Sequence, residues 1–69
     1  MFSVILRNAD RIRRYTVSLH TAAGWVVARE GDGESPQRRI YRDWQRVERA
    51  LALFRWEVSQ LTAHGWQQI

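Results

Sequence analysis

The spacing of apolar residues along the chain changes once, near residue 42. Before that point apolar and polar residues alternate, which is typical of strands with one buried and one solvated face. The clearest alternation places Tyr15, Val17 and Leu19 on one side of the chain. On this pattern we predict strands at Phe2–Leu6, Ile12–His20 and Trp25–Arg29, and a further short strand at Arg38–Tyr41.

The segment "EGDGESPQ", residues 30–37, predicts a loop between the third and fourth strands. Gly33 can adopt positive φ, and Pro36 disfavours a central strand. The acids in this segment alternate with other residues, a spacing that fits a solvated hairpin tip better than a calcium-binding loop. These acids are Glu30, Asp32 and Glu34.

After residue 43 the apolar residues recur every three or four positions and form one stripe of a helix. The stripe consists of Trp44, Val47, Leu51, Phe54, Val58 and Leu61. Asp43 can cap the start of this helix, and Gly65 can end it in the left-handed conformation. We therefore predict a helix from Trp44 to His64, roughly 31 Å long at about 1.5 Å per residue. The predicted fold is α+β, with a small antiparallel sheet of three to four strands and one long C-terminal helix on one face, in a single domain over residues 1–69.

A second apolar line runs beside this stripe and contains Leu53 and Trp56. One helix cannot bury both lines against one small sheet. Either the N-terminal strand covers part of Trp56, or Leu53 and Trp56 form a contact between subunits. We favour the contact, because an exposed Trp and Leu together are unfavourable on a monomer surface.

The composition describes a small domain with little core. The chain has 69 residues, 45% of them apolar and 26% charged, and it contains four tryptophans and no cysteine. A core of this size stabilises a fold by only a few kcal/mol, and no disulfide or thiolate metal site can add to it. Self-association is one remaining source of stability. The N-terminal "MFSVIL" is too short for a signal-peptide core or a membrane span, so we expect a cytoplasmic protein that does not bind membranes.

All eleven cationic residues other than histidine are arginines, and with seven acids they leave a net charge of +4. Such a balance favours phosphate, nucleic acid or an acidic protein as partner, although a GC-rich coding sequence also produces arginine in place of lysine. One group runs from the fourth predicted strand into the helix: Arg38, Arg39, Arg42, Arg46 and Arg49. The other lies on and beside the second and third strands: Arg11, Arg13, Arg14 and Arg29. Either group can instead be a solvated, charge-paired face.

Residue patterns of catalysis are not found in the sequence. His20 and His64 are the only histidines, and no ligand spacing around them suggests a metal site. The serines lie in no nucleophile-elbow motif, and "GDG" lacks the length and the lysine of a phosphate-binding loop. We therefore predict a protein that is not an enzyme and that uses no metal, no cofactor and no small-molecule substrate.

The order of motifs from residue 12 to residue 66 resembles the WGR domain, a module named for a Trp-Gly-Arg signature. The resemblance rests on the alternating strand around Tyr15, on Trp25, on "VAREG" and on the glycine loop that follows. It continues in the helical "RALALF" and the final "GW", where the family pattern corresponds to Ala50, Phe54 and Trp66. The chain ends before the usual final strand of the family.

Within the signature itself, Arg29 and Gly31 correspond to the arginine and to the glycine that follows it. Val27 and Ala28 stand where the family has Trp and Gly. WGR domains combine a sheet with one helix, occur in poly(ADP-ribose) polymerases and bacterial regulatory proteins, and take part in nucleic-acid binding. In the polymerases the signature Trp packs against DNA and the arginine meets its backbone, so the resemblance implies a phosphate contact for Arg29.

From the arginine content and this resemblance we predict a non-catalytic nucleic-acid-binding module, for DNA or RNA. Its predicted phosphate contacts are Arg29, Arg13, Arg14, Arg38, Arg39, Arg42 and Arg46. The alternative is a protein-interaction or homodimerisation module, in which Trp56 and Leu53 form the interface and the arginines maintain solubility.

Overall fold

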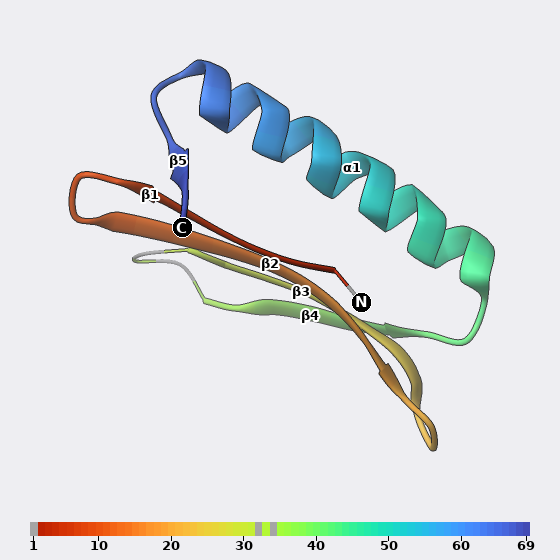
Figure 1. The fold of residues 1–69 in the computed structure, drawn as a ribbon. Helices are drawn as coiled ribbons and strands as arrows, with labels where there is room; N and C mark the ends of the chain where they lie inside the picture. Colours follow the sequence, from red (N-terminus) through yellow and green to blue (C-terminus); the bar gives the residue numbers. More distant parts are fainter. Residues whose placement is uncertain (1, 32, 34) are drawn as a thin grey trace.

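A computed structural model gives the structure of residues 2–31, 33 and 35–69. Its elements are β1 (Phe2–Asn8), β2 (Arg11–His20), β3 (Gly24–Gly31), β4 (Gln37–Tyr41), α1 (Trp44–Ala63) and β5 (Gln67–Gln68). The strands form one antiparallel sheet in the order β4-β3-β2-β1-β5, and α1 lies across one of its faces (Figure 1). The predicted α+β fold is confirmed. Of the acids of the predicted hairpin tip, Asp32 and Glu34 lie outside the described residues.

The strand register explains why the alternating pattern produces a buried face. Val4 of β1 pairs with Tyr15 of β2, and Val17 of β2 pairs with Val27 of β3. Because neighbouring strands align these residues, their side chains all point to the same side of the sheet. That side is the one that α1 covers.

Local signals at both ends fix the length of α1. At the start, Asp43 has extended backbone angles, and its carboxylate accepts a hydrogen bond of 3.0 Å from the backbone N–H of Gln45. At the end, Gly65 has a φ of 95°, and the N–H of Trp66 donates to the carbonyl of Leu61 at 3.0 Å. This is a Schellman arrangement, which a glycine with positive φ favours. Both predicted caps are confirmed, and the last helical residue is Ala63.

The sheet has one more strand than the sequence predicts. β5 follows the helix and pairs with β1 through Leu6 and Gln68, and the N–H of Ile69 donates to the carbonyl of Ile5 at 2.9 Å. The expectation that no strand follows the helix was therefore wrong. A two-residue strand has no alternation for a pattern to detect, and its position follows from the reversal of the chain at Gly65.

The core lies between α1 and the three strands β1, β2 and β3. Its buried residues are Leu6, Tyr15, Val17, Val27, Val47, Phe54 and Trp66. Phe54 reaches down from the helix, and its ring lies 5.0 Å from the ring of Tyr15 and 6.4 Å from that of Phe2, centroid to centroid. The stripe predicted from helical spacing thus supplies the helix side of the core.

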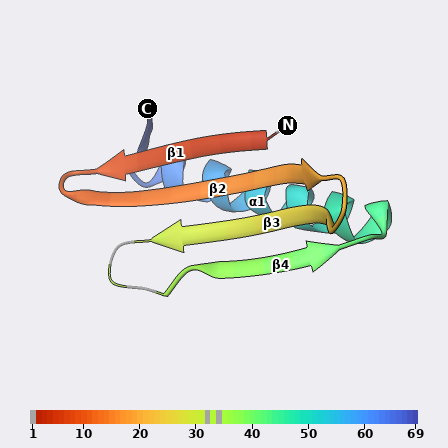
Figure 2. The same cartoon turned by 90° about the horizontal axis from the view of Figure 1, so that it is seen from below.

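The other face of the sheet is bare. Figure 2, which views the molecule from that side, shows α1 crossing behind the sheet at an oblique angle, and no other described element lies in front of the sheet. No helix in the described part of the chain has both the length and the apolar character needed to cross a bilayer. The oblique course of α1 leaves part of β4 without a helix above it, and this is where the candidate site lies.

Candidate nucleic-acid interface

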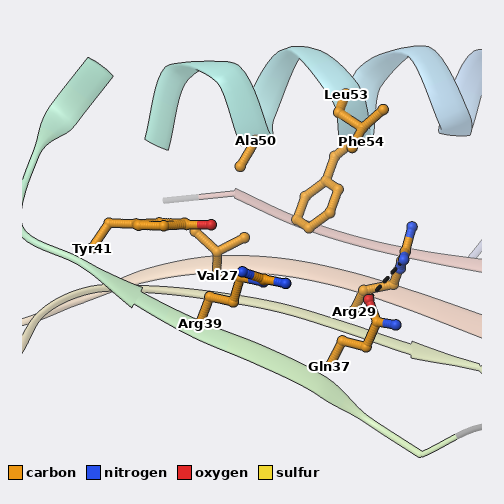
Figure 3. Close-up of a pocket in the computed structure, with 8 residues that line it drawn as sticks. All are labelled: Val27, Arg29, Gln37, Arg39, Tyr41, Ala50, Leu53 and Phe54. Carbon is orange, nitrogen blue, oxygen red and sulfur yellow. Dashed lines mark hydrogen bonds between the residues drawn. The ribbon is translucent and has the colours of Figure 1, made fainter. Parts of the chain in front are cut away.

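A groove lies between β4 and α1 on the helix side of the sheet. Its inner part has a volume of about 130 Å³. Figure 3 shows the side chains that line it: Val27, Arg29, Gln37, Arg39, Tyr41, Ala50, Leu53 and Phe54. Val27, Ala50 and Phe54 make an apolar floor, and the polar and charged side chains come from β3 and β4.

The groove continues outward along the first turns of the helix. This outer part has a volume of about 420 Å³ and adds Arg46 and Arg49 to the lining, together with Arg39, Tyr41 and Leu53. We call the two parts together the arginine groove. Arg39 approaches from the strand and the other two arginines from the helix, so positive charge surrounds the opening.

The register of β4 explains which of its side chains enter the arginine groove. Gln37 pairs with Arg29, Arg39 pairs with Val27, and Tyr41 pairs with Trp25. Val27 belongs to the core beneath the helix, so its partner on β4 faces the same side. Alternation then directs Arg38, between Gln37 and Arg39, to the bare face.

The inner end of the arginine groove is closed by an ion pair. The Nη1 of Arg29 lies 2.8 Å from the Oε1 of Glu57 on α1, and its Nη2 donates to the Oε1 of Gln37 at 2.7 Å. The pair joins the helix to β3 and β4. Both ends of the guanidinium are therefore already occupied by protein groups.

A buried tyrosine lies beside this ion pair. The hydroxyl of Tyr15 and the Oε2 of Glu57 are both buried, and neither makes a hydrogen bond with a described residue. Burial is the main cause of a raised pKa for Tyr15; the carboxylate of Glu57 raises it further, while the guanidinium of Arg13 opposes both effects. Tyr15 is consequently neutral at physiological pH, and its ring is part of the core.

The seven arginines predicted as phosphate contacts occupy different places. Arg39 and Arg46 line the outer part of the arginine groove, and Arg29 lies at its inner end. Arg13 stacks at 5.6 Å over the ring of Trp66, after the C-terminal end of the helix. The others lie elsewhere: Arg14 and Arg38 project from the bare face, and Arg42 lies in the connection between β4 and α1.

The structure adds Arg49, which is not among the seven. Its signal in the sequence is its spacing of three from Arg46, which places both arginines on the same side of a helix. Among the described residues, no carboxylate lies within ion-pair distance of Arg39, Arg46 or Arg49. Within the described part of the chain, the three arginines therefore converge without an acidic partner to neutralise them.

Leu53 and Trp56, the predicted interface residues, are exposed. The side chain of Leu53 lines the arginine groove and is 49% exposed, and Trp56 is 60% exposed. At this exposure most of the Trp56 surface is open, and a contact of Leu53 and Trp56 with another subunit stays a prediction.

Within residues 2–31, 33 and 35–69, no three His, Cys, Asp or Glu side chains come together in a group that could hold a metal. The chemistry that the site offers is therefore that of guanidinium groups, one phenol and an apolar floor, which suits binding of an anionic ligand.

Comparison with known proteins adds no family to this description. No protein-family model, no curated protein and no solved structure matches the chain. The function must therefore be inferred from the geometry of the chain's own residues.

Proposed function

We propose that this chain is a non-catalytic nucleic-acid-binding module that contacts phosphates in the arginine groove. The observation that carries the proposal is the convergence of Arg39, Arg46 and Arg49, which have no carboxylate partner among the described residues. A guanidinium group donates paired hydrogen bonds to phosphate oxygens and keeps its charge at any physiological pH. Three such groups around one groove favour a ligand that carries several phosphates.

Two features of the sequence support the same class of ligand. The net charge of +4 attracts polyanions over a distance, and the resemblance to WGR domains implies a role in nucleic-acid binding. In this proposal Arg39, Arg46 and Arg49 make the contacts. Four predicted contacts lie outside the arginine groove and contribute only to the attraction: Arg13, Arg14, Arg38 and Arg42.

The salt dependence of binding tests the proposal. Fluorescently labelled single-stranded and duplex oligonucleotides are titrated with the protein, and anisotropy is measured at low and at higher salt. Three neutralised phosphates predict that affinity falls roughly 20-fold for single strands and 40-fold for duplex between about 50 and 200 mM salt. Absence of binding at low salt, where charge interactions are strongest, would refute the proposal.

Two neighbouring arginines provide a matched pair of variants. We expect Arg39→Ala to weaken binding roughly 5-fold, as about 1 kcal/mol is typical of one exposed charge contact. Arg38→Ala removes the same charge one residue away, on the bare face, and should weaken binding less. Equal effects of the two substitutions would show that net charge, and not the arginine groove, determines the affinity.

A second candidate function is a homodimer or another protein complex formed through Leu53 and Trp56. The observation in its favour is the exposure of these two large apolar side chains on one side of the helix. Sedimentation equilibrium over a range of protein concentrations tests it. A dimer that Trp56→Glu dissociates would support this candidate, and a monomer at all concentrations would exclude the homodimer.

A further inference from the structure

The four tryptophans of the chain differ in what surrounds them. Trp66 is buried, and the rings of Trp25 and Trp44 pack against each other with centroids 4.7 Å apart. The indole N–H of Trp44 also donates to Glu48 at 2.7 Å. Trp56 is the most exposed of the four and has neither a ring contact nor a hydrogen bond with a described residue. It is therefore the indole that is free to contact a ligand.

Trp56 lies in line with the arginine groove. It follows Leu53 by three positions and Arg49 by seven, and residues at these spacings lie on the same side of a helix, one or two turns apart. Arg49 and Leu53 both line the arginine groove. The distance along the helix from Arg46 to Trp56 is about 15 Å at 1.5 Å per residue. Along this path, guanidinium groups come first and an apolar surface follows.

We propose that Leu53 and Trp56 hold unpaired bases, so that the ligand of the arginine groove is a single-stranded nucleic acid. This inference rests on the proposed function and specifies its ligand. Arg39, Arg46 and Arg49 hold the phosphates of the same strand. The bases stack on the ring of Trp56 and pack against the side chain of Leu53.

The reason for a single strand is that charged and apolar side chains lie next to each other along this path. A duplex hides the faces of its bases in the helical stack and offers phosphates and base edges to a protein. It would satisfy the arginines but leave Leu53 and Trp56 in water. A single strand offers phosphates and base faces together, and proteins bind it with a basic groove and aromatic stacking surfaces. Only a single strand can therefore contact the arginines with its phosphates and Leu53 and Trp56 with its bases.

The test compares three labelled probes that differ in what they offer. They are a single strand of about 12 thymidines, an abasic strand with the same number of phosphates, and a duplex of equal length, a size within the range of single-strand binding sites. We expect the thymidine strand to bind roughly tenfold more tightly than the abasic strand, as expected for stacking of one base or more. The duplex should also bind more weakly than the thymidine strand.

Variants of Trp56 show whether stacking is the cause. Trp56→Ala should weaken binding of the thymidine strand roughly tenfold and leave binding of the abasic strand unchanged, while Trp56→Phe should retain most of the affinity. Stacking should also quench part of the tryptophan emission, and Trp56→Phe should remove that quenching. Ile40→Ala is the matched control, because Ile40 is 56% exposed on the bare face.

The outcomes separate the two proposals. Salt-dependent binding that is equal for the thymidine and abasic strands, or tighter for the duplex, overturns the inference and leaves the proposed function standing. No binding of any probe at low salt overturns both. Loss of a dimer in Trp56→Ala, with binding of the thymidine strand unchanged, also overturns the inference and assigns Trp56 to the protein interface.

Discussion

The covered face and the bare face of the sheet carry arginines from the same strands, but these arginines have different surroundings. On β4, Arg39 faces the helix and meets Arg46 and Arg49 in the arginine groove. Arg38, the preceding residue, projects to the bare face beside Pro36. On β2, Arg14 also faces the bare side and pairs in register with Glu30 of β3. Arginines therefore converge on one face and are dispersed on the other.

This difference shows that the helix, and not the sheet alone, makes the candidate site. The strands supply Arg39 and Tyr41, and α1 supplies Arg46, Arg49 and Leu53. Since α1 crosses the sheet obliquely, it buries the core over β1, β2 and β3 and leaves an open edge over β4 (Figures 1 and 2).

Removal of an apolar side chain should lower the free energy of unfolding much more on the covered face than on the bare face. Phe54→Ala removes a ring that is 5% exposed and contacts Tyr15 and Phe2, and we expect it to lower the free energy of unfolding by about 3–5 kcal/mol. Ile40→Ala, on the bare face, should change it by less than about 0.5 kcal/mol. Urea denaturation followed by circular dichroism measures both. A large loss in Ile40→Ala would mean that a partner covers the bare face.

Removal of an arginine should also lower the free energy of unfolding more on the covered face than on the bare face, but by a smaller amount. Arg29→Ala leaves the carboxylate of Glu57 without its guanidinium partner and should lower the free energy of unfolding by about 1–3 kcal/mol. Arg14→Ala should stay within about 0.5 kcal/mol of the wild type. The double variant Arg29→Ala/Glu57→Gln should recover part of the loss. If Arg29→Ala instead retained full stability and lost nucleic-acid binding, Arg29 would have the phosphate contact that the WGR resemblance implies.

On the covered face, Tyr15 should make the stability of the fold depend on pH in the alkaline range. The pKa of Tyr15 is raised in the folded state, so the folded protein holds the phenolic proton more tightly than the unfolded chain does. The resulting stability is fully present below the unfolded pKa of 10.0 and is lost as the pH rises through the folded pKa. Urea midpoints measured from neutral pH to above pH 10 should therefore decrease, and Tyr15→Phe should reduce that decrease. An unchanged decrease in Tyr15→Phe would assign it to other groups.

Much of the fold follows from local patterns in the sequence. Alternation around Tyr15 places β2, and the three-four spacing around Phe54 places α1 and its buried stripe. Asp43 and Gly65 mark the ends of the helix because each satisfies backbone groups locally. β5 was not predicted, because its pairing with β1 depends on tertiary contacts and not on its own two residues.

The candidate site followed from the sequence only in part. Helical spacing groups Arg46 with Arg49, and β4 supplies Arg39. The register of β4 on β3 decides whether Arg38 or Arg39 faces the helix. A shift of one residue would exchange the faces of these two arginines. The ion pair between Arg29 and Glu57 joins residues that are 28 positions apart, so no local sequence pattern predicts it. Long-range register and helix placement therefore decide which arginines converge.

A substitution of Arg46 separates an effect on stability from an effect on binding. Arg46 lies in the first turn of α1, which contains no acidic residue, so its charge opposes the helix dipole. Arg46→Glu should raise the free energy of unfolding by about 0.3–1 kcal/mol at low salt, an increase that added salt should reduce. It should at the same time abolish most nucleic-acid binding, because it places an acid in the arginine groove. Arg55→Glu makes the same change of charge on the opposite flank of α1 and should reduce binding less. If Arg46→Glu raised stability and lost binding, misfolding would be excluded as the reason for the loss. If it raised stability and bound the thymidine strand as the wild type does, the arginine groove would not be the binding site.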